Sequence, residues 1–78
     1  PEHNEHLHIM LNAYWEALEF ELPPTTEQGL TPWRRVIDTA LESPNDFCAP
    51  ETAPVVDAAI FDVSARSVVV LIAENEPR

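Results

Sequence analysis

Two glutamates in this chain have a spacing that could serve acid–base chemistry. Glu19 and Glu21 alternate with Leu18, Phe20 and Leu22, which is the pattern of a β-strand. On such a strand the two carboxylates would share a face, about 7 Å apart, and glycosidases use carboxylate pairs at roughly 5–9.5 Å. A catalytic pair also needs one carboxyl group held protonated in a deep cleft, which an exposed strand face does not supply. We therefore interpret the glutamates as a solvated face and predict no catalytic residue in this chain.

Three histidines and one cysteine could in principle hold a metal or act as a nucleophile. His6 and His8 stand two residues apart near the amino end, and His3 precedes them. Zinc needs three or four converging ligands, and an end segment must lose chain entropy to gather them. Cys48 lies in a proline-rich segment without a basic neighbour to activate its thiol. The sequence thus predicts no metal site, no cofactor and no reactive thiol.

Aromatic side chains are the residues best suited to binding, because sugar rings stack their C–H faces on flat aromatic surfaces. The chain includes Tyr14, Trp15, Trp33 and Phe47. Tryptophans of a small domain mostly belong to its core, so we expect Trp33, which opens a predicted element, to be buried. Tyr14 and Trp15 fall in a predicted turn, where exposure is expected. These two residues are the candidate carbohydrate-binding site, and the alternative is that they pack against another domain.

Composition limits the classes of partner. The 78 residues include 14 acidic side chains, four arginines and no lysine, which gives a formal net charge of −10. A surface of this charge repels phosphate backbones and anionic lipids, so we expect no nucleic-acid partner and no membrane partner. No apolar run approaches the about 20 residues of a membrane-spanning helix. The single cysteine excludes an intramolecular disulfide, and we expect a cytoplasmic location.

Hydrophobic patterns predict most of the elements that would position these residues. Apolar runs predict strands at about 7–12, 18–22, 57–63 and 66–73. In the first strand Leu7, Ile9 and Leu11 share one face, and short connections predict that the first two and the last two strands form hairpins. Proline-rich loops are expected at 23–32 and 43–54, and flexible ends at 1–6 and 74–78.

The segment after the first loop fits two templates. The apolar residues of 33–41 recur at helical spacing, with Thr31 as a candidate N-cap and Pro32 as the first helical residue. The same segment also alternates as a strand. Local periodicity alone favours the helix.

Three motifs resemble the isoamylase-type glycogen-debranching enzymes. Residues 7–23 resemble that family's sequence of a hydrophobic strand, Asn-x-Tyr-Trp-Glu, a second strand and Leu-Pro. Residues 33–40 resemble its Trp-(four residues)-Asp-Thr segment, and residues 66–71 its closing Arg-Ser-x-x-x-Leu strand. The motifs occur in the family's order and cover nearly the whole chain.

The resemblance implies an all-β fold, a small antiparallel β-sandwich of the type that forms the C-terminal domain of α-amylase-family enzymes, as a single domain over 1–78. It makes 33–40 a strand, against the local periodicity. The parent activity of the family is hydrolysis of α-1,6-glucosidic branch points in glycogen or starch-like glucans. That chemistry belongs to a (β/α)8 barrel whose acidic catalytic residues have no counterpart in this chain.

The implied role is that of a non-catalytic accessory domain in glycogen breakdown, which stabilises or caps the catalytic barrel and has that barrel as its partner. A domain with a small core of its own would then expose an apolar patch where the barrel packs. Two alternatives remain open. One is a stand-alone module that binds α-glucan, and the other is an acidic protein-interaction module in which 33–41 is helical.

Overall fold

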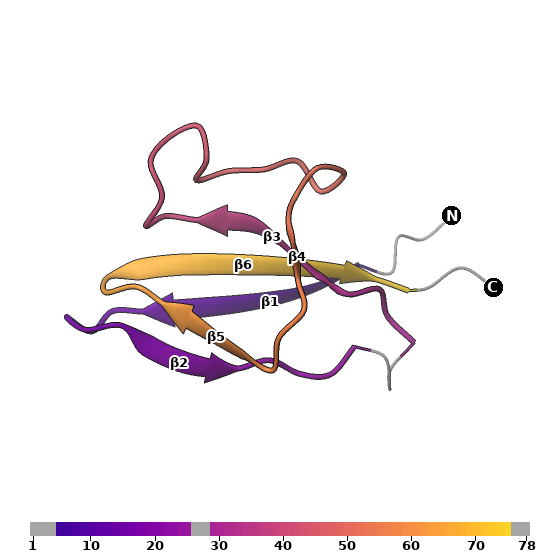
Figure 1. The fold of residues 1–78 in the computed structure, drawn as a ribbon, viewed down its shortest axis with the longest axis horizontal. Helices are drawn as coiled ribbons and strands as arrows, with labels where there is room; N and C mark the ends of the chain where they lie inside the picture. Colours follow the sequence, from indigo (N-terminus) through magenta and orange to yellow (C-terminus); the bar gives the residue numbers. More distant parts are fainter. Residues whose placement is uncertain (1–4, 26–28, 76–78) are drawn as a thin grey trace.

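The structure is a computed structural model that describes residues 5–25 and 29–75. In these ranges it contains the strands β1 (Glu5–Asn12), β2 (Leu18–Glu21), β3 (Trp33–Asp38), β4 (Val55–Val56), β5 (Ile60–Val63) and β6 (Ser67–Glu74). Sheet A has the strand order β1-β6-β3-β4, and sheet B consists of β2 and β5. The two antiparallel sheets pack as a small β-sandwich (Figure 1). The predicted all-β sandwich is confirmed. No helix in the described part of the chain is long and apolar enough to cross a membrane.

The two predicted hairpins are wrong. β1 pairs with β6 along its whole length, from Glu5 opposite Glu74 to Asn12 opposite Ser67. β2 pairs with β5 instead of with β1. Each short connection therefore carries the chain from one sheet to the other, as Figure 1 shows at the end away from the chain termini. The reason is length: β1 and β6 are eight-residue strands that match each other, whereas β2 has only four residues.

The strand predicted at 57–63 begins later than expected, at Ile60, and the short β4 that precedes it lies in the other sheet. β4 pairs with β3 in sheet A, and β5 pairs with β2 in sheet B. The three residues between β4 and β5 make the crossing, and there the carbonyl of Ala59 accepts a hydrogen bond from the N–H of Leu22 at 2.8 Å. The apolar pattern therefore continues through residues 57–59, although the backbone there leaves β3 and joins β2.

β3 shows that the ambiguous segment is a strand, as the family resemblance implies. Arg34 and Arg35 face Ile72 and Leu71 of β6, and the register then shifts so that Ile37 faces Val70. An extra residue in one strand of a pair breaks the period of two. Apolar residues on both sides of this bulge then stand three and four positions apart, which is why the sequence resembles a helix. The alternative of an acidic protein-interaction module required a helix at 33–41, and the structure has a strand there.

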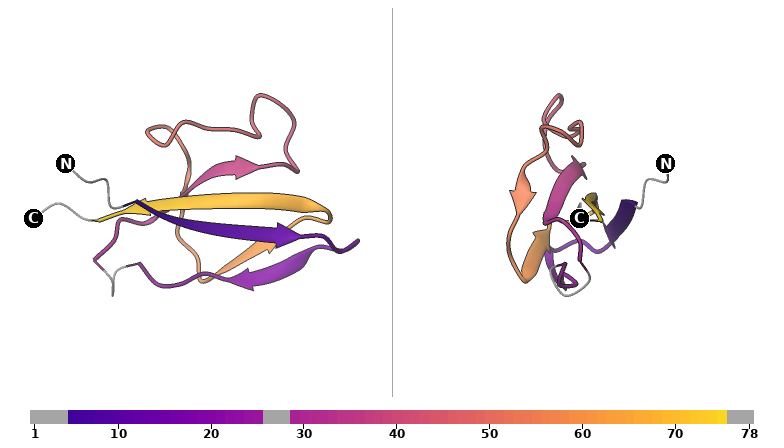
Figure 2. Two further views of the ribbon diagram at one scale, coloured as in Figure 1. Left: turned by 180° about the vertical axis from the view of Figure 1, so that it is seen from behind. Right: turned by 90° about the vertical axis from the view of Figure 1, so that its right-hand side faces the viewer.

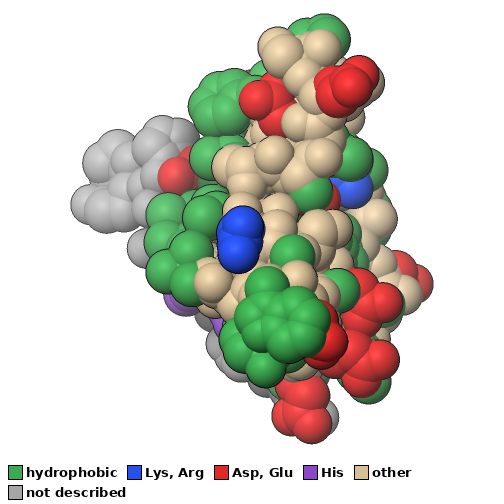
Figure 3. All heavy atoms as spheres, turned by 90° about the vertical axis from the view of Figure 1, so that its left-hand side faces the viewer, with side chains coloured by type: hydrophobic (Ala, Val, Ile, Leu, Met, Phe, Trp, Pro, Cys, Tyr) green, Lys and Arg blue, Asp and Glu red, His purple; other side chains and the backbone are tan. Residues whose placement is uncertain are grey.

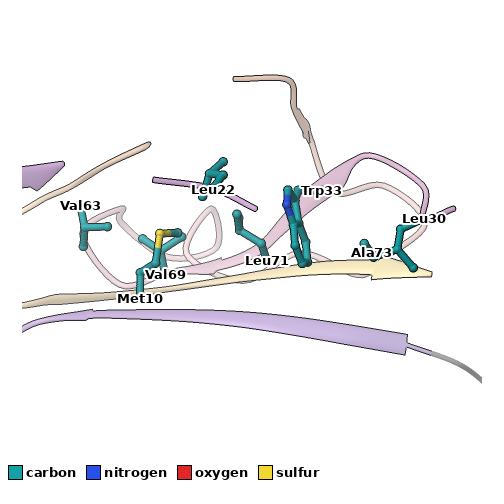
Figure 4. Close-up of a cluster of buried hydrophobic side chains, with 8 residues drawn as sticks. All are labelled: Met10, Leu22, Leu30, Trp33, Val63, Val69, Leu71 and Ala73. Carbon is teal, nitrogen blue, oxygen red and sulfur yellow. The ribbon is translucent and has the colours of Figure 1, made fainter. Parts of the chain in front are cut away.

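The core lies between the two sheets. Figure 4 shows side chains of β1 and β6 pointing to one side of sheet A, toward side chains on the segments opposite. The cluster consists of Met10, Leu22, Leu30, Trp33, Val63, Val69, Leu71 and Ala73. Trp33 is buried, as predicted, and its indole N–H donates a hydrogen bond to the carbonyl of Pro23 at 3.0 Å. The inner face of β6 follows the period of two that a half-buried strand requires.

Strand pairing extends to both ends of the described chain. Glu5 and Glu74 face each other, inside the segments 1–6 and 74–78 that the sequence predicts to be flexible. The remainder of those segments, apart from His6 and Asn75, lies outside the described residues. The described residues of the predicted loops 23–32 and 43–54 contain only isolated bridges, at Leu30 and Phe47.

Candidate functional site

The candidate carbohydrate-binding residues lie together on the surface, in the connection from β1 to β2. Tyr14 is 48% exposed and Trp15 is 62% exposed. Their ring centroids are 5.4 Å apart, and the ring planes are inclined by 41°. We call this pair the aromatic corner. Figure 3 views the molecule from the end that carries this connection and shows hydrophobic side chains next to carboxylates.

The backbone of the aromatic corner is fixed by one buried side chain. Asn12, at the end of β1, is 0% exposed. Its amide nitrogen donates to the carbonyls of Glu16 at 2.8 Å, Val63 at 3.0 Å and Ser64 at 3.1 Å. Its amide oxygen accepts a hydrogen bond from the N–H of Tyr14 at 2.9 Å. Asn12 therefore joins the β1–β2 connection to the β5–β6 connection, and both the nitrogen and the oxygen of its amide are hydrogen-bonded.

A second contact between the two connections involves Arg66. Its N–H donates to the carbonyl of Tyr14 at 3.1 Å, and its φ of 53° lies in the left-handed region that residues other than glycine seldom adopt. Such a conformation persists only where the surrounding structure holds it. The two exposed rings thus stand on a backbone that is held from both sides.

Sequence reasoning missed Asn12. The signal was its position, because Asn12 follows Met10 by two residues and so shares the inner face of β1. A polar side chain on an inner face needs hydrogen-bond partners. Those partners lie about fifty residues away in the chain, and the sequence did not identify them.

The second candidate surface is the side of sheet A that faces away from sheet B. Leu7, Ile9 and Leu11 of β1 are 60%, 63% and 65% exposed. Their partners across the ladder are also aliphatic. We define the outer face as the three cross-strand pairs Leu7–Ile72, Ile9–Val70 and Leu11–Val68. In the rear view of Figure 2, β1 and β6 lie in the foreground with no described segment over them. The exposed apolar area comes mainly from Leu7, Ile9 and Leu11, since Val68 and Val70 are half-buried and Ile72 is buried.

A groove continues from one end of the outer face. It has a volume of about 420 Å³ and shares Ile72 with the outer face. Its polar lining includes Arg34, Glu51 and Glu74. The guanidinium of Arg34 is turned to the chain itself and donates to the carbonyl of Ala53 at 2.8 Å. The groove therefore offers a partly polar depression beside an apolar surface.

The carboxylates considered for catalysis are on an exposed strand. Glu19 and Glu21 are both exposed on β2, and Glu19 faces Asp62 of β5. Neither Glu19 nor Glu21 lines the groove. Their surroundings supply none of the burial that a catalytic acid requires.

The histidines are engaged with other groups. His6 is within 3.3 Å of the side-chain oxygen of Asn75, and the ring of His8 lies 5.7 Å from that of Trp33. His3 is outside the described residues. Among the described residues, no three His, Cys, Asp or Glu side chains gather as metal ligands would. Cys48 is half-buried, and its backbone N–H donates to the carbonyl of Val36.

Comparison with known proteins gives one match. A sequence model of the family described as "Isoamylase, C-terminal" matches residues 1–72. No curated protein and no solved structure matches the chain. The match covers all six strands except the last residues of β6. The chain therefore belongs to the isoamylase C-terminal domain family, the accessory domain of isoamylase-type glycoside hydrolases.

Proposed function

We propose that this domain is the non-catalytic accessory part of a cytoplasmic glycogen- or starch-debranching enzyme and that its outer face docks on the catalytic barrel. The barrel would hydrolyse α-1,6 branch points, and the domain would cap and stabilise it. The observation that carries this proposal is the row of Leu7, Ile9 and Leu11, each at least 60% exposed on a strand whose opposite face is in the core.

The energetics of the exposed row favour a partner. Complete burial of a leucine or isoleucine side chain contributes about 1.5–3 kcal/mol relative to exposure. Three such side chains are mostly exposed here, so covering them would contribute several kcal/mol. A chain of 78 residues has a core that supplies only about 3–5 kcal/mol of stability. Docking would therefore add to the stability of this domain by an amount similar to what its own core provides.

The distribution of charged residues favours an outer face that contacts a protein partner and does not face solvent. The chain carries a net charge of −10, yet the six side chains of the outer face are all aliphatic. Large exposed apolar patches are uncommon on monomers and mark surfaces of interaction. The adjoining groove, with Arg34 and two carboxylates in its lining, would receive a polar side chain from the same partner.

Substitutions on the outer face test this role in the whole enzyme. We expect the triple variant Leu7→Thr, Ile9→Thr, Leu11→Thr to lower the temperature at which the enzyme loses activity, because the interdomain contact loses apolar area. Threonine has the β-branched shape that strands favour, so the domain alone should unfold at an unchanged or higher temperature. The measurement is residual activity after heating, together with circular dichroism of the isolated domain.

The matched control changes the other sheet. The triple variant Glu19→Gln, Glu21→Gln, Asp62→Asn alters exposed positions on β2 and β5, and the enzyme that carries it should behave as the unmodified enzyme does. Identical heat inactivation of the outer-face variant and the unmodified enzyme would contradict docking by this surface.

A further inference from the structure

We infer that the aromatic corner, Tyr14 and Trp15, is an α-glucan-binding site that is separate from the outer face. The choice of α-glucan as ligand rests on the proposed function, because the parent enzyme would act on such chains. The site itself rests on geometry. It would hold a neutral oligosaccharide next to the enzyme without taking part in catalysis.

Two neighbouring rings are exposed at the aromatic corner. Trp15 is 62% exposed and Tyr14 is 48% exposed, whereas Trp33 is only 6% exposed. Aromatic rings bring a large apolar area, which a folded chain normally buries. The two rings contact each other, with centroids 5.4 Å apart and planes inclined by 41°. Two exposed rings at one place suit a ligand with apolar faces of ring size.

The backbone beneath the rings is held in place before a ligand arrives. Asn12 binds both connections with four hydrogen bonds, and Arg66 adds a fifth contact to Tyr14. A surface that is already ordered loses less conformational entropy when it binds.

The charge of the chain limits the chemistry of the ligand. The net charge of −10 disfavours anionic ligands such as phosphates and nucleic acids. Glu16, Ser64 and Arg66 are exposed on the same two connections and bring polar side chains to this end of the domain. A sugar is a ligand of this kind, because its ring has an apolar C–H face bordered by hydroxyl groups.

The two tryptophans allow a direct test by nuclear magnetic resonance. A ¹⁵N-labelled chain has two indole N–H signals, one from the corner and one from the core. We expect titration with maltoheptaose to shift the Trp15 signal. The Trp33 signal should stay in place, because this N–H is bonded to the carbonyl of Pro23 inside the fold. The Trp33 signal also reports that the chain remains folded.

Single substitutions measure the contribution of each ring. Trp15→Ala and Tyr14→Ala should each weaken maltoheptaose binding about two- to tenfold, the range that corresponds to one aromatic contact. Phe47→Ala is the matched control, since Phe47 is an exposed aromatic residue, at 69%, in the loop between β3 and β4. This variant should bind as the unmodified chain does.

Two results with the isolated chain, and a third with the whole enzyme, would overturn the inference. One is a Trp15 signal that does not move at millimolar maltoheptaose while the Trp33 signal shows a folded chain. The other is equal weakening by Phe47→Ala and Trp15→Ala. In the whole enzyme, retardation in a native gel that contains glycogen gives an independent measurement. Trp15→Ala should reduce this retardation, and unchanged retardation would place the rings against the barrel and contradict a sugar site.

These results are distinguishable from a failure of docking. The variant Leu7→Thr, Ile9→Thr, Leu11→Thr should leave the maltoheptaose titration of the isolated chain unchanged. Conversely, Trp15→Ala should leave heat inactivation of the whole enzyme unchanged. Each proposal can therefore fail while the other stands.

Discussion

Replacement of Asn12 by aspartate is expected to unfold this domain. Aspartate has the same shape, but it presents an acceptor where the amide donates to the carbonyls of Glu16, Val63 and Ser64. A carboxylate would then be buried against three oxygen atoms. An uncompensated buried charge costs about 3–5 kcal/mol, which equals the whole stability expected from a core of this size. Asn12→Ala leaves the same carbonyls and the N–H of Tyr14 without a partner and should cost about 3 kcal/mol.

Urea denaturation followed by tryptophan fluorescence measures this loss. Asn45 provides the matched control, because it is exposed in the loop between β3 and β4. Asn45→Asp makes the same chemical change and should alter the free energy of unfolding by less than about 0.5 kcal/mol. Equal urea midpoints for Asn12→Asp and the unmodified chain would show that the buried amide does not hold the two connections together.

Truncation of Leu71 is the second large effect that we expect. Leu71 lies on the inner face of β6 and is 0% exposed. Leucine-to-alanine changes in a packed core cost about 2–5 kcal/mol, because they remove apolar contact and leave a cavity. Ile9 lies on the outer face of the same sheet and is 63% exposed. Ile9→Thr should change the stability of the isolated chain by only about 0.5 kcal/mol.

The comparison of Leu71→Ala with Ile9→Thr determines which face of sheet A is the core. Both residues belong to the paired strands β1 and β6, so their local environments in the ladder are similar. Thermal unfolding of the two isolated variants gives the measurement. A larger loss of stability for Ile9→Thr than for Leu71→Ala would mean that the outer face is covered within the domain itself.

The strands were predictable because each pattern is local. Alternation identified β1 and β2 nearly to their ends, and the β-branched run identified β6. The pairing of these strands was not predictable from the same patterns. Whether β1 pairs with β2 or with β6 depends on how strands far apart in the sequence match in length. Only the family resemblance identified β3 as a strand, since its bulge produces a helical spacing.

The exposed surfaces were also predictable only in part, where a local sequence pattern determines them. Exposure of Tyr14 and Trp15 could be predicted because both lie in a short connection between strands. Periodicity separated the two faces of β1 but did not say which one is buried. The more aliphatic face, with Leu7, Ile9 and Leu11, is the exposed one, while Met10 and Asn12 point inward. That choice is made by sheet B, whose position no local pattern records.

Chemical labelling of the outer face in the whole enzyme tests the docking proposal most directly. With Cys48 replaced by serine, a cysteine introduced at Ile9 reports on the outer face, and one introduced at Glu19 reports on β2. We predict that a thiol reagent modifies Ile9→Cys quickly in the isolated chain and far more slowly in the whole enzyme. Glu19→Cys should react at the same rate in both. Equal rates for Ile9→Cys in the isolated chain and in the whole enzyme would contradict docking of the outer face on the catalytic barrel.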